Sequence, residues 1–349
     1  MQRKIIRFAV IGCGQMGREF ANAAGRWKHL LNLDFEPQII AACDRNQKNL
    51  QWFSDYVPTL KESTENYHHV LGNSDVEAVY CAIPHDQHEE VYVNIMKAGK
   101  HLLGEKPFGI DIRANNSILK EYRDHPKQLI RCSSEFPFYP GAYRISNMMH
   151  QGAFGKIFEV EAGFWHSSDL DPDKPINWKR RISQNGEYGC MGDLGMHVLH
   201  LPFRFGWKPD NVRGLLTKVY DERPDANGKM TPCETWDNAN LSCEVIIERQ
   251  KFPMHVSMKR IAPGNINTWF IKIYGTVSSV EFSTKNPKIL RILDYSRGGL
   301  QEWRLVETVY KSAYPTITGE VFEFGFSDSL LLMWAAFCDE LVHGRENML

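Results

Sequence analysis

The sequence predicts an α/β fold with two domains. A doubly wound parallel sheet is expected in residues 1–135, and an α+β region with a mainly antiparallel sheet in residues 136–349. Up to about residue 135, short apolar runs alternate with amphipathic stretches, which is the pattern of βα units on a parallel sheet. After about residue 150 the runs become longer and alternate apolar with polar side chains, as strands do when one face is buried.

Each strand expected in the first domain is a short apolar run, and each helix carries apolar residues at helical spacing. The strands are expected at residues 4–12, 38–44, 76–84, 101–107 and 128–136. The helices are expected at residues 16–31, 46–56, 63–73, 87–99 and 112–125. Gly72 and Gly99 lie where C-caps belong, which supports the ends of two of these helices.

The second domain is predicted to be a sheet followed by a closing helix. Its strands are expected at residues 156–166, 211–220, 240–248, 252–260, 267–275, 278–284, 289–294 and 302–308. Trp269, Ile271 and Ile273 alternate with polar or exposed positions, so one face of their strand should be buried. A helix is expected at residues 328–344.

The composition points to a soluble protein with small partners. The 41 basic and 42 acidic residues give a net charge of −1, so nothing indicates binding to nucleic acid or to a membrane surface. The eight cysteines contain no C-x-x-C pair and are expected to be reduced thiols in the cytoplasm. Arg7 limits the N-terminal apolar run to four residues before Gly12, too short for a signal peptide, and no run of about 18 apolar residues is present.

The segment "AVIGCGQMGREF" carries G-x-G-x-x-G directly after a strand and at the start of a helix. Gly12 would permit the tight turn, Gly14 the close approach of a pyrophosphate, and Gly17 close packing of the helix. The spacing alone is weak evidence, because turns commonly need glycine. At the first βα turn of an alternating domain, it predicts a Rossmann domain that binds a dinucleotide.

Asp44 ends the second expected strand, where a carboxylate can accept the ribose hydroxyls of an adenosine. It would repel the 2′-phosphate of NADP, so it favours NAD. Arg45 could stack on adenine or support that phosphate, which leaves NADP possible. A helix N-cap role for Asp44 is compatible with cofactor binding.

Lys106, in "GEKPFG", lies just past the end of a parallel strand. That edge faces the crevice where doubly wound sheets bind ligands. Taken alone, the Lys-Pro pair could equally be an exposed turn.

The segment "CMGDLGMHVLH" places Asp193, His197 and His200 on one face of a helix. Three interpretations are open: a zinc ligand set, an acid/base pair, or the edge of a packed core. No cluster of Cys or His elsewhere offers matching ligands, so no metal is expected, and His200 is expected to line the pocket or the domain core.

Four successive segments, "AVIGCGQMG", "VYCAIPHDQHEEV", "AGKHLLGEKPFG" and "GDLGMHVLHL", resemble signatures of the Gfo/Idh/MocA oxidoreductases. Their order along the chain makes the resemblance specific. It implies a Rossmann domain, a second domain with a large open sheet, and metal-free hydride transfer between a nicotinamide and a secondary alcohol of a sugar or cyclitol. It also implies a homodimer or homotetramer formed through the C-terminal sheet.

The resemblance assigns catalysis to Lys106, Asp193 and His197, with the lysine polarising the oxygen, the histidine as base and the aspartate orienting. The residues expected at the cofactor are Gly12, Gly14, Gln15, Met16, Gly17, Asp44, Arg45, Ile83, Pro84, His88, Glu105, Lys106, Trp178 and Arg180. Those expected at the substrate are Lys106, Phe136, Tyr139, Trp165, Asp193, His197 and His200.

Two positions depart from the family pattern. His200 stands where aspartate is common, and His85 where asparagine is common. For His85 and His88 a role at the start of a helix is also open. The departures leave room for a redox-neutral glycosidase or lyase that retains NAD and oxidises a ring carbon transiently, and a non-catalytic sugar- or nucleotide-sensing regulator is a remote further alternative.

Overall fold

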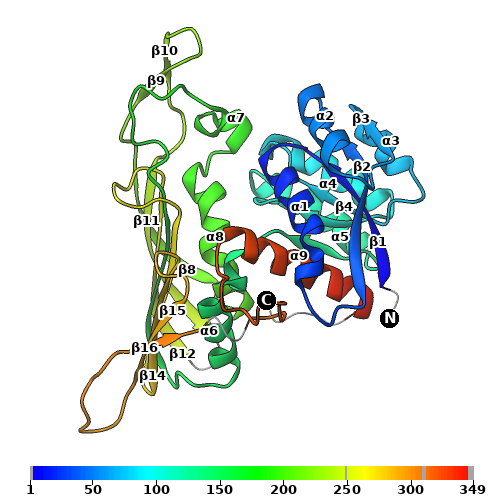
Figure 1. The fold of residues 1–349 in the computed structure, drawn as a ribbon. Coiled ribbons are helices and arrows are strands. Elements are labelled where there is room, and N and C mark those ends of the chain that lie inside the picture. The colour runs from blue at the N-terminus through cyan, green and yellow to red at the C-terminus, as the bar shows by residue number, and fades with distance from the viewer. Residues whose placement is uncertain (1–2, 248–249, 309–311, 345–349) are drawn as a thin grey trace. The chain divides into compact units, whose positions relative to one another are not determined.

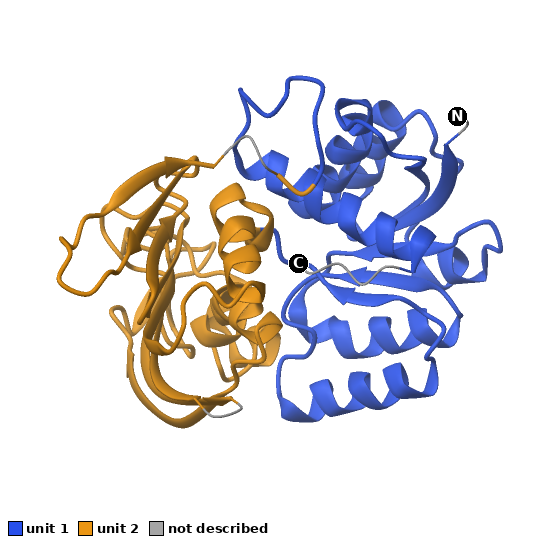
Figure 2. Ribbon diagram, turned by 90° about the horizontal axis from the view of Figure 1, so that it is seen from below, with its two compact units in different colours: residues 1–135, 314–347 blue, residues 136–313, 348–349 orange. Residues whose placement is uncertain are grey.

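The computed structural model describes residues 3–247, 250–308 and 312–344. The chain forms two compact units (Figure 2): unit 1 comprises residues 1–135 and 314–347, and unit 2 essentially residues 136–313. The division falls at the predicted position between residues 135 and 136. Residues 314–347, however, belong to unit 1, although the sequence suggested the second domain.

Unit 1 is built on a six-stranded parallel sheet with the order β3-β2-β1-β4-β5-β6 (Figure 1). The strands are β1 (Lys4–Ile11), β2 (Phe35–Cys43), β3 (Glu62–Thr64), β4 (Ala78–Cys81), β5 (His101–Gly104) and β6 (Ile130–Cys132). The predicted doubly wound parallel sheet is therefore confirmed. The short edge strand β3 lies where the sequence predicted the start of a helix, because the third helix begins later, at Tyr67.

Three helices of unit 1 begin at short polar side chains that cap them. Asn46, Asn66 and Asp111 each accept a hydrogen bond from a first-turn amide of the helix that follows. The helices are α1 (Gln15–Gly25), α2 (Gln47–Tyr56), α3 (Tyr67–Gly72), α4 (His88–Lys97), α5 (Ile112–Asp124) and α9 (Phe326–His343), with 3-10 turns η1 (Trp27–His29) and η2 (His85–Gln87).

Helix α9 explains why the chain returns to unit 1. Its residues from Ser329 to Cys338 are all buried, and it packs on α1 and β2. Trp334 meets Phe20 of α1 and Tyr80 of β4 at ring-centroid distances of 4.9 and 5.5 Å. A helix that is apolar on nearly every side needs a buried position, but the pattern alone does not say in which unit.

Unit 2 contains an eight-stranded sheet with the order β16-β15-β14-β13-β7-β12-β11-β8, in which only β7 and β12 pair in parallel. The strands are β7 (Ile157–Trp165), β8 (Pro209–Thr217), β11 (Asn238–Ile247), β12 (Gln250–Lys259), β13 (Thr268–Gly275), β14 (Ser278–Ser283), β15 (Ile289–Asp294) and β16 (Arg304–Glu307). The predominantly antiparallel sheet is thus confirmed. Residue 248 of the predicted strand 240–248 lies outside the described residues.

Helices cover one face of this sheet, and the core of unit 2 lies between the helices and that face (Figure 1). They are α6 (Pro140–His150), α7 (Ile182–Asn185) and α8 (Cys190–Arg204), with 3-10 turns η3 (Phe136–Phe138) and η4 (Trp178–Arg180). A separate hairpin pairs β9 (Glu222–Pro224) with β10 (Met230–Pro232). Trp269, Ile271 and Ile273 are buried, while Phe270 and Lys272 on the opposite face are partly exposed.

None of the helices within the described residues is long and apolar enough to cross a membrane.

Candidate active site

The glycine motif forms a tight turn between β1 and α1. Gly12 has φ = +92°, and a Cβ there would lie 2.2 Å from the carbonyl oxygen of Ala82. A Cβ on Gly17 would lie 2.3 Å from the Gly12 oxygen, so α1 reaches the turn only because Gly17 has no side chain. In contrast, a Cβ on Gly14 would meet nothing within 4 Å. The first and third glycines therefore build the turn, and the second leaves open space above it.

The first turn of α1 fits a phosphate group. Gly14 is the N-cap and provides no side-chain cap for the first-turn amides of Gln15, Met16 and Gly17. Unpaired amides at a helix N-terminus, together with the helix dipole, attract anions. The residues present therefore fit the pyrophosphate of a dinucleotide.

Asp44 follows β2 and ties the glycine turn to the start of α2. Its carboxylate accepts hydrogen bonds from the backbone amide of Cys13 at 2.8 Å, from that of Asn46 at 2.8 Å and from the side chain of Asn49 at 3.1 Å. These contacts fix the carboxylate at the carboxyl edge of the sheet. Oδ2 accepts two of these bonds and Oδ1 only one, so Oδ1 keeps a lone pair with which it could accept a ribose hydroxyl.

Lys106 follows β5 at the same edge and is partly exposed. Glu105, beside it, is 8% exposed, and its side chain accepts a hydrogen bond from Tyr80 at 2.7 Å. Because parallel strands end together at one edge, Lys106 and the glycine turn share the carboxyl edge of unit 1.

Glu135 lies three residues beyond β6 and is 5% exposed. The backbone pairing of β5 and β6 continues through the hydrogen bond from Ser133 to Gly104, which brings this segment beside Glu105 and Lys106. Burial raises the pKa of Glu135 to about 7, the charge of Glu105 adds to this effect, and Lys106 opposes it. The sequence analysis gave no role to this buried carboxyl group.

His88, expected at the cofactor, is completely buried. Its ring nitrogens lie 2.6 Å from the Pro107 carbonyl oxygen and 3.0 Å from that of Ile83. Burial lowers the pKa of His88 to about 4. The ring therefore links the loops that follow β4 and β5, and a contact of His88 with the cofactor stays a prediction.

Asp193 in the first turn of α8 is fully buried in unit 2. It pairs with Arg260, just after β12, at 2.5 Å and with Lys179 of η4 at 3.1 Å. Burial tends to lower the pKa of Arg260, but the acidic groups around it, with Asp193 first among them, together raise this pKa above its ordinary value. The sequence analysis did not identify Arg260 as a partner.

His197, one turn further along α8, is held among aromatic rings. Phe136 and Phe164 meet the imidazole edge to face at 5.2 and 5.3 Å between centroids. The indole N–H of Trp269 donates to the His197 carbonyl oxygen at 3.0 Å. These contacts fix both the ring and its helix on the covered face of the sheet.

Four predicted site residues of unit 2 have well-defined surroundings. Phe136 and Tyr139 are 0% and 4% exposed and stack on each other in the core around His197. Trp165 points to the uncovered face of the sheet, because alternation along β7 places Phe164 on the His197 side. Arg180 is 1% exposed between Asp169 and Asp237. Contacts of these four residues with substrate or cofactor stay predictions.

His200 and Trp178 are less buried. His200 is partly exposed, and its Nε2 accepts a hydrogen bond from Arg204 at 3.3 Å. Burial lowers the pKa of His200 to about 3, and Arg204 adds to the effect, so its ring is neutral. Trp178 is partly exposed and carries Lys179 over its ring at 5.6 Å. Contacts of these two residues with ligands stay predictions.

A metal centre is not formed by the described residues: among them, no three His, Cys, Asp or Glu side chains gather in a way that could hold an ion. Asp193 instead pairs with cationic side chains of the protein.

Residues 6–131 match the model of the Gfo/Idh/MocA group described as an oxidoreductase family with an NAD-binding Rossmann fold. This match assigns the domain of residues 6–131 to the family. The glycine turn, Asp44 and Lys106 all lie within the matched residues, so unit 1 contains the NAD-binding domain of a Gfo/Idh/MocA oxidoreductase.

Several Gfo/Idh/MocA relatives are similar to the chain over part of its length. An uncharacterized oxidoreductase of Synechocystis sp. is 27% identical over 68% of this chain and 62% of its own length. The levoglucosan dehydrogenase of Pseudarthrobacter phenanthrenivorans is 23% identical over 48% of this chain and 43% of its own. A glycosyl hydrolase family 109 protein of Phocaeicola vulgatus is 26% identical over 52% and 39%.

Solved structures share the fold of both units. A levoglucosan dehydrogenase solved in complex with NADH superposes with a TM-score of 0.85 at 20% identity, covering 98% of this chain and 91% of that one. At this identity the likeness shows the fold alone.

Proposed function

We propose that this protein is an NAD-dependent oxidoreductase that transfers hydride reversibly between the nicotinamide and a secondary hydroxyl or ketone of a sugar, cyclitol or glycoside. The observation that carries the proposal is the position of Lys106 at the carboxyl edge of an NAD-binding sheet. An ammonium group stabilises a substrate oxygen whose negative charge grows as the C–H bond breaks. The relatives named levoglucosan dehydrogenase and inositol 2-dehydrogenase support this substrate class.

We assign the proton transfer to His197. Imidazole side chains exchange protons near neutral pH, so His197 can take the hydroxyl proton during oxidation and return it during reduction. Asp193 lies between Arg260 and Lys179, and a carboxylate held by two cations is a poor base. Asp193 is therefore assigned an orienting role and not that of the base. Bound NAD supplies the hydride acceptor or donor.

The proposal is tested by incubating purified protein with NAD or NADP and a panel of sugars, cyclitols and glycosides, and recording the absorbance of the reduced nicotinamide. Lys106→Ala should reduce the rate by about 10²-fold or more. Lys97→Ala is the matched control, because Lys97 is exposed at the end of α4 and should leave the rate unchanged. The oxidoreductase assignment is wrong if no compound of the panel reduces NAD or NADP and Lys106→Ala leaves the binding of every tested compound unchanged. That result would support a sensing role.

NAD is the proposed cofactor in preference to NADP. The Asp44 carboxylate is fixed where the adenosine ribose is expected and would repel a 2′-phosphate. Titration by nicotinamide fluorescence should therefore give tighter binding of NADH than of NADPH. Asp44→Ser should reduce the difference, and equal affinities in the wild type would contradict the assignment.

A redox-neutral glycosidase is the second candidate, and the similarity to the glycosyl hydrolase family 109 protein favours it. In that reaction the hydride removed from a ring carbon returns to the product, so no reduced cofactor accumulates. Purified protein that retains NAD and cleaves aryl glycosides without a net change in nicotinamide absorbance would support this candidate over the first.

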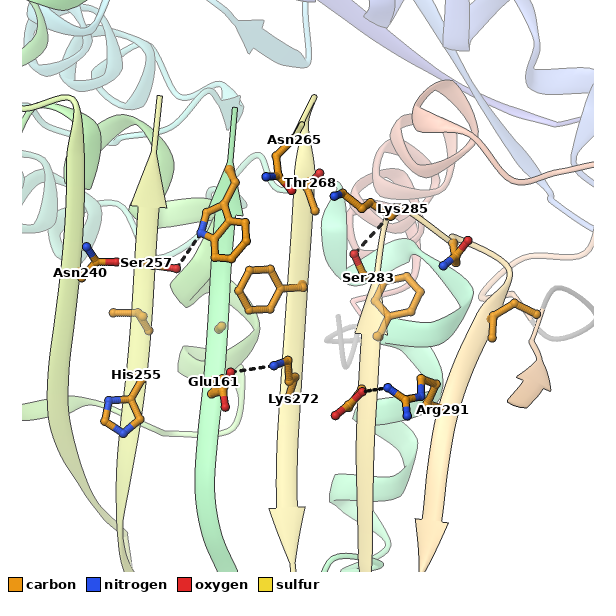
Figure 3. Close-up of a pocket in the computed structure, with 18 of the residues that line it drawn as sticks. Glu161, Asn240, His255, Ser257, Asn265, Thr268, Lys272, Ser283, Lys285 and Arg291 are labelled. Atoms are coloured by element: carbon orange, nitrogen blue, oxygen red, sulfur yellow. Dashed lines mark hydrogen bonds and ion pairs between the residues drawn. The ribbon is translucent and has the colours of Figure 1, made fainter. Parts of the chain in front are cut away.

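We propose further that a second copy of the chain covers the open face of the unit 2 sheet. This face contains a depression of about 860 Å³ (Figure 3). One row of side chains crosses it with alternating charge: Glu161, Lys272, Glu281 and Arg291 are direct neighbours on β7, β13, β14 and β15. From β7 to β15 the charges run negative, positive, negative, positive, so the same row taken from β15 to β7 has the opposite charge at each position. A two-fold axis between β13 and β14 would therefore place unlike charges of the two copies opposite each other.

The oligomer is tested by sedimentation of the wild type and of charge variants. Lys272→Glu would oppose two negative charges across the axis and should weaken association about tenfold or more. The double variant Lys272→Glu/Glu281→Lys opposes unlike charges again and should restore association. A wild type that stays monomeric at high concentration would contradict a covered sheet.

We propose a cytoplasmic location, because seven of the eight cysteines are buried, as is usual for thiols that stay reduced.

A further inference from the structure

Helix α4 holds the backbone on both sides of Lys106. The Tyr92 hydroxyl donates to the Glu105 carbonyl oxygen at 2.7 Å, and His88 contacts the Pro107 carbonyl oxygen at 2.6 Å. His88 and Tyr92 lie one helical turn apart, and their rings stack at 4.6 Å with an interplanar angle of 19°. The carbonyl before Lys106 and the carbonyl after it are thus fixed by one face of one helix.

The Tyr92 contact depends on Gly104. A Cβ at position 104 would lie 2.7 Å from the Tyr92 ring, well inside the shortest ordinary contact. Gly104 is the last residue of β5 and is paired on both sides, with Cys81 and Cys132, so the strand cannot move aside easily. Tyr92 reaches across Gly104 only because that residue has no side chain.

Tyr92 is more than a packing residue in this arrangement. Its ring is fully buried and meets Phe108 edge to face at 5.1 Å, so the orientation of the hydroxyl is fixed. Burial, with the charges around it, raises the pKa of Tyr92 well above its ordinary value, and the hydroxyl stays a donor. A buried donor placed on a backbone carbonyl restricts the peptide that leads into Lys106.

We propose that Tyr92 and Gly104 are positioning residues for Lys106, with the Tyr92–Glu105 hydrogen bond across Gly104 setting the direction in which the lysine leaves the sheet edge. The proposal rests on the proposed function for the catalytic role of Lys106, but the structural statement is independent of the substrate. Catalytic groups must be held within about 0.5 Å of the productive position, so a loosened loop should lower the rate of the chemical step more than the binding of cofactor.

The test uses Tyr92→Phe, which keeps the ring against Gly104 and His88 and removes only the hydroxyl. Lys106 is labelled with an amine-reactive reagent in the protein without added substrate, and its modification rate is followed by mass spectrometry of peptides. Loss of the hydrogen bond should raise the rate about fivefold, because Lys106 spends more time in freely accessible positions. Lys97 on the same helix is the internal reference and should react at an unchanged rate.

Tyr67→Phe is the matched control, since it removes a hydroxyl that donates to Glu90 at 2.8 Å in the same unit and away from the Lys106 loop. It should leave Lys106 labelling unchanged. Gly104→Ala displaces the Tyr92 ring and so removes the hydrogen bond from Tyr92 to Glu105 by a second route. This variant keeps the test decisive if Tyr92→Phe fails to fold.

With an active sugar from the panel, Tyr92→Phe should lower kcat while the NADH dissociation constant stays within about twofold. Lys106 labelling that is unchanged in both Tyr92→Phe and Gly104→Ala would overturn the proposal. Faster labelling of Lys106 in a protein that oxidises no sugar would support the positioning role and count against the proposed function, so the two failures are distinguishable.

Discussion

Arg260 lies 2.5 Å from the Asp193 carboxylate, and both side chains are cut off from solvent at 3% and 0% exposure. A buried ion pair of this kind adds little net stability, but removal of one partner leaves an uncompensated charge. We predict that Arg260→Leu lowers the free energy of unfolding by about 3 kcal/mol. Lys179 remains at 3.1 Å as partial compensation, so the loss should stay at the lower end of the usual range.

Asp193→Asn in the Arg260→Leu background is the control. Because the isolated charge is then gone, the double variant should be more stable than Arg260→Leu alone. Chemical denaturation of the single and double variants measures the difference, and strictly additive losses would show that the two groups do not interact.

The glycine turn gives a paired prediction. Gly12→Ala adds a Cβ at φ = +92° and 2.2 Å from Ala82, so it should lower stability strongly. Gly14→Ala adds a Cβ that meets no protein atom within 4 Å, so it should fold normally and lose NADH affinity about tenfold or more. Thermal melting and fluorescence titration separate the two effects. Normal NADH binding by Gly14→Ala would show that the pyrophosphate does not approach this glycine.

Glu135 predicts a dependence of stability on pH. Its folded pKa of about 7 lies above the ordinary value of 4.5, so its stabilising contribution is complete below pH 4.5 and is lost as the pH rises to about 7. Glu135→Gln has no such loss. Its stability relative to wild type should therefore be higher at pH 8 than at pH 4.5, by on the order of 3 kcal/mol. A difference that does not vary with pH would mean that Glu135 is not a buried acid.

His200 predicts the opposite trend at acidic pH. Its pKa is lowered from 6.5 to about 3, so the folded protein loses stability as the pH falls below 6.5 because the unfolded chain binds the proton more readily. His200→Asn removes this effect. Between pH 8 and pH 5 its stability relative to wild type should rise by about 1–2 kcal/mol, given that solvent reaches part of the ring. Parallel stability curves for the two proteins would contradict a lowered pKa of His200.

The cofactor edge was predictable from sequence because its signals are local. The glycines of the first turn, Asp44 at the end of β2 and Lys106 at the end of β5 are each identified by a strand and the residues that follow it. The order of strands then follows from the rules for doubly wound sheets, which bring those ends to one edge.

The residues that support the site were not predictable, because their partners are distant in the chain. Arg260 is 67 residues from Asp193, and no local pattern connects them. Tyr92 has the spacing of an ordinary core residue, and only its contact with Gly104 distinguishes it. Trp165 and Phe164 are adjacent aromatic residues, and a shift of one position along a strand exchanges the two faces of a sheet.

The most direct test of the account follows the hydride itself. Sugars and cyclitols that carry deuterium on individual ring carbons are incubated with the protein and NAD, and the nicotinamide is analysed by mass spectrometry. We predict that deuterium from one secondary carbon appears in the reduced cofactor with the wild type, and that Lys106→Ala reduces its transfer about 10²-fold or more. Oxidation of a sugar without deuterium in the cofactor, or equal transfer by the wild type and Lys106→Ala, would contradict the central claim.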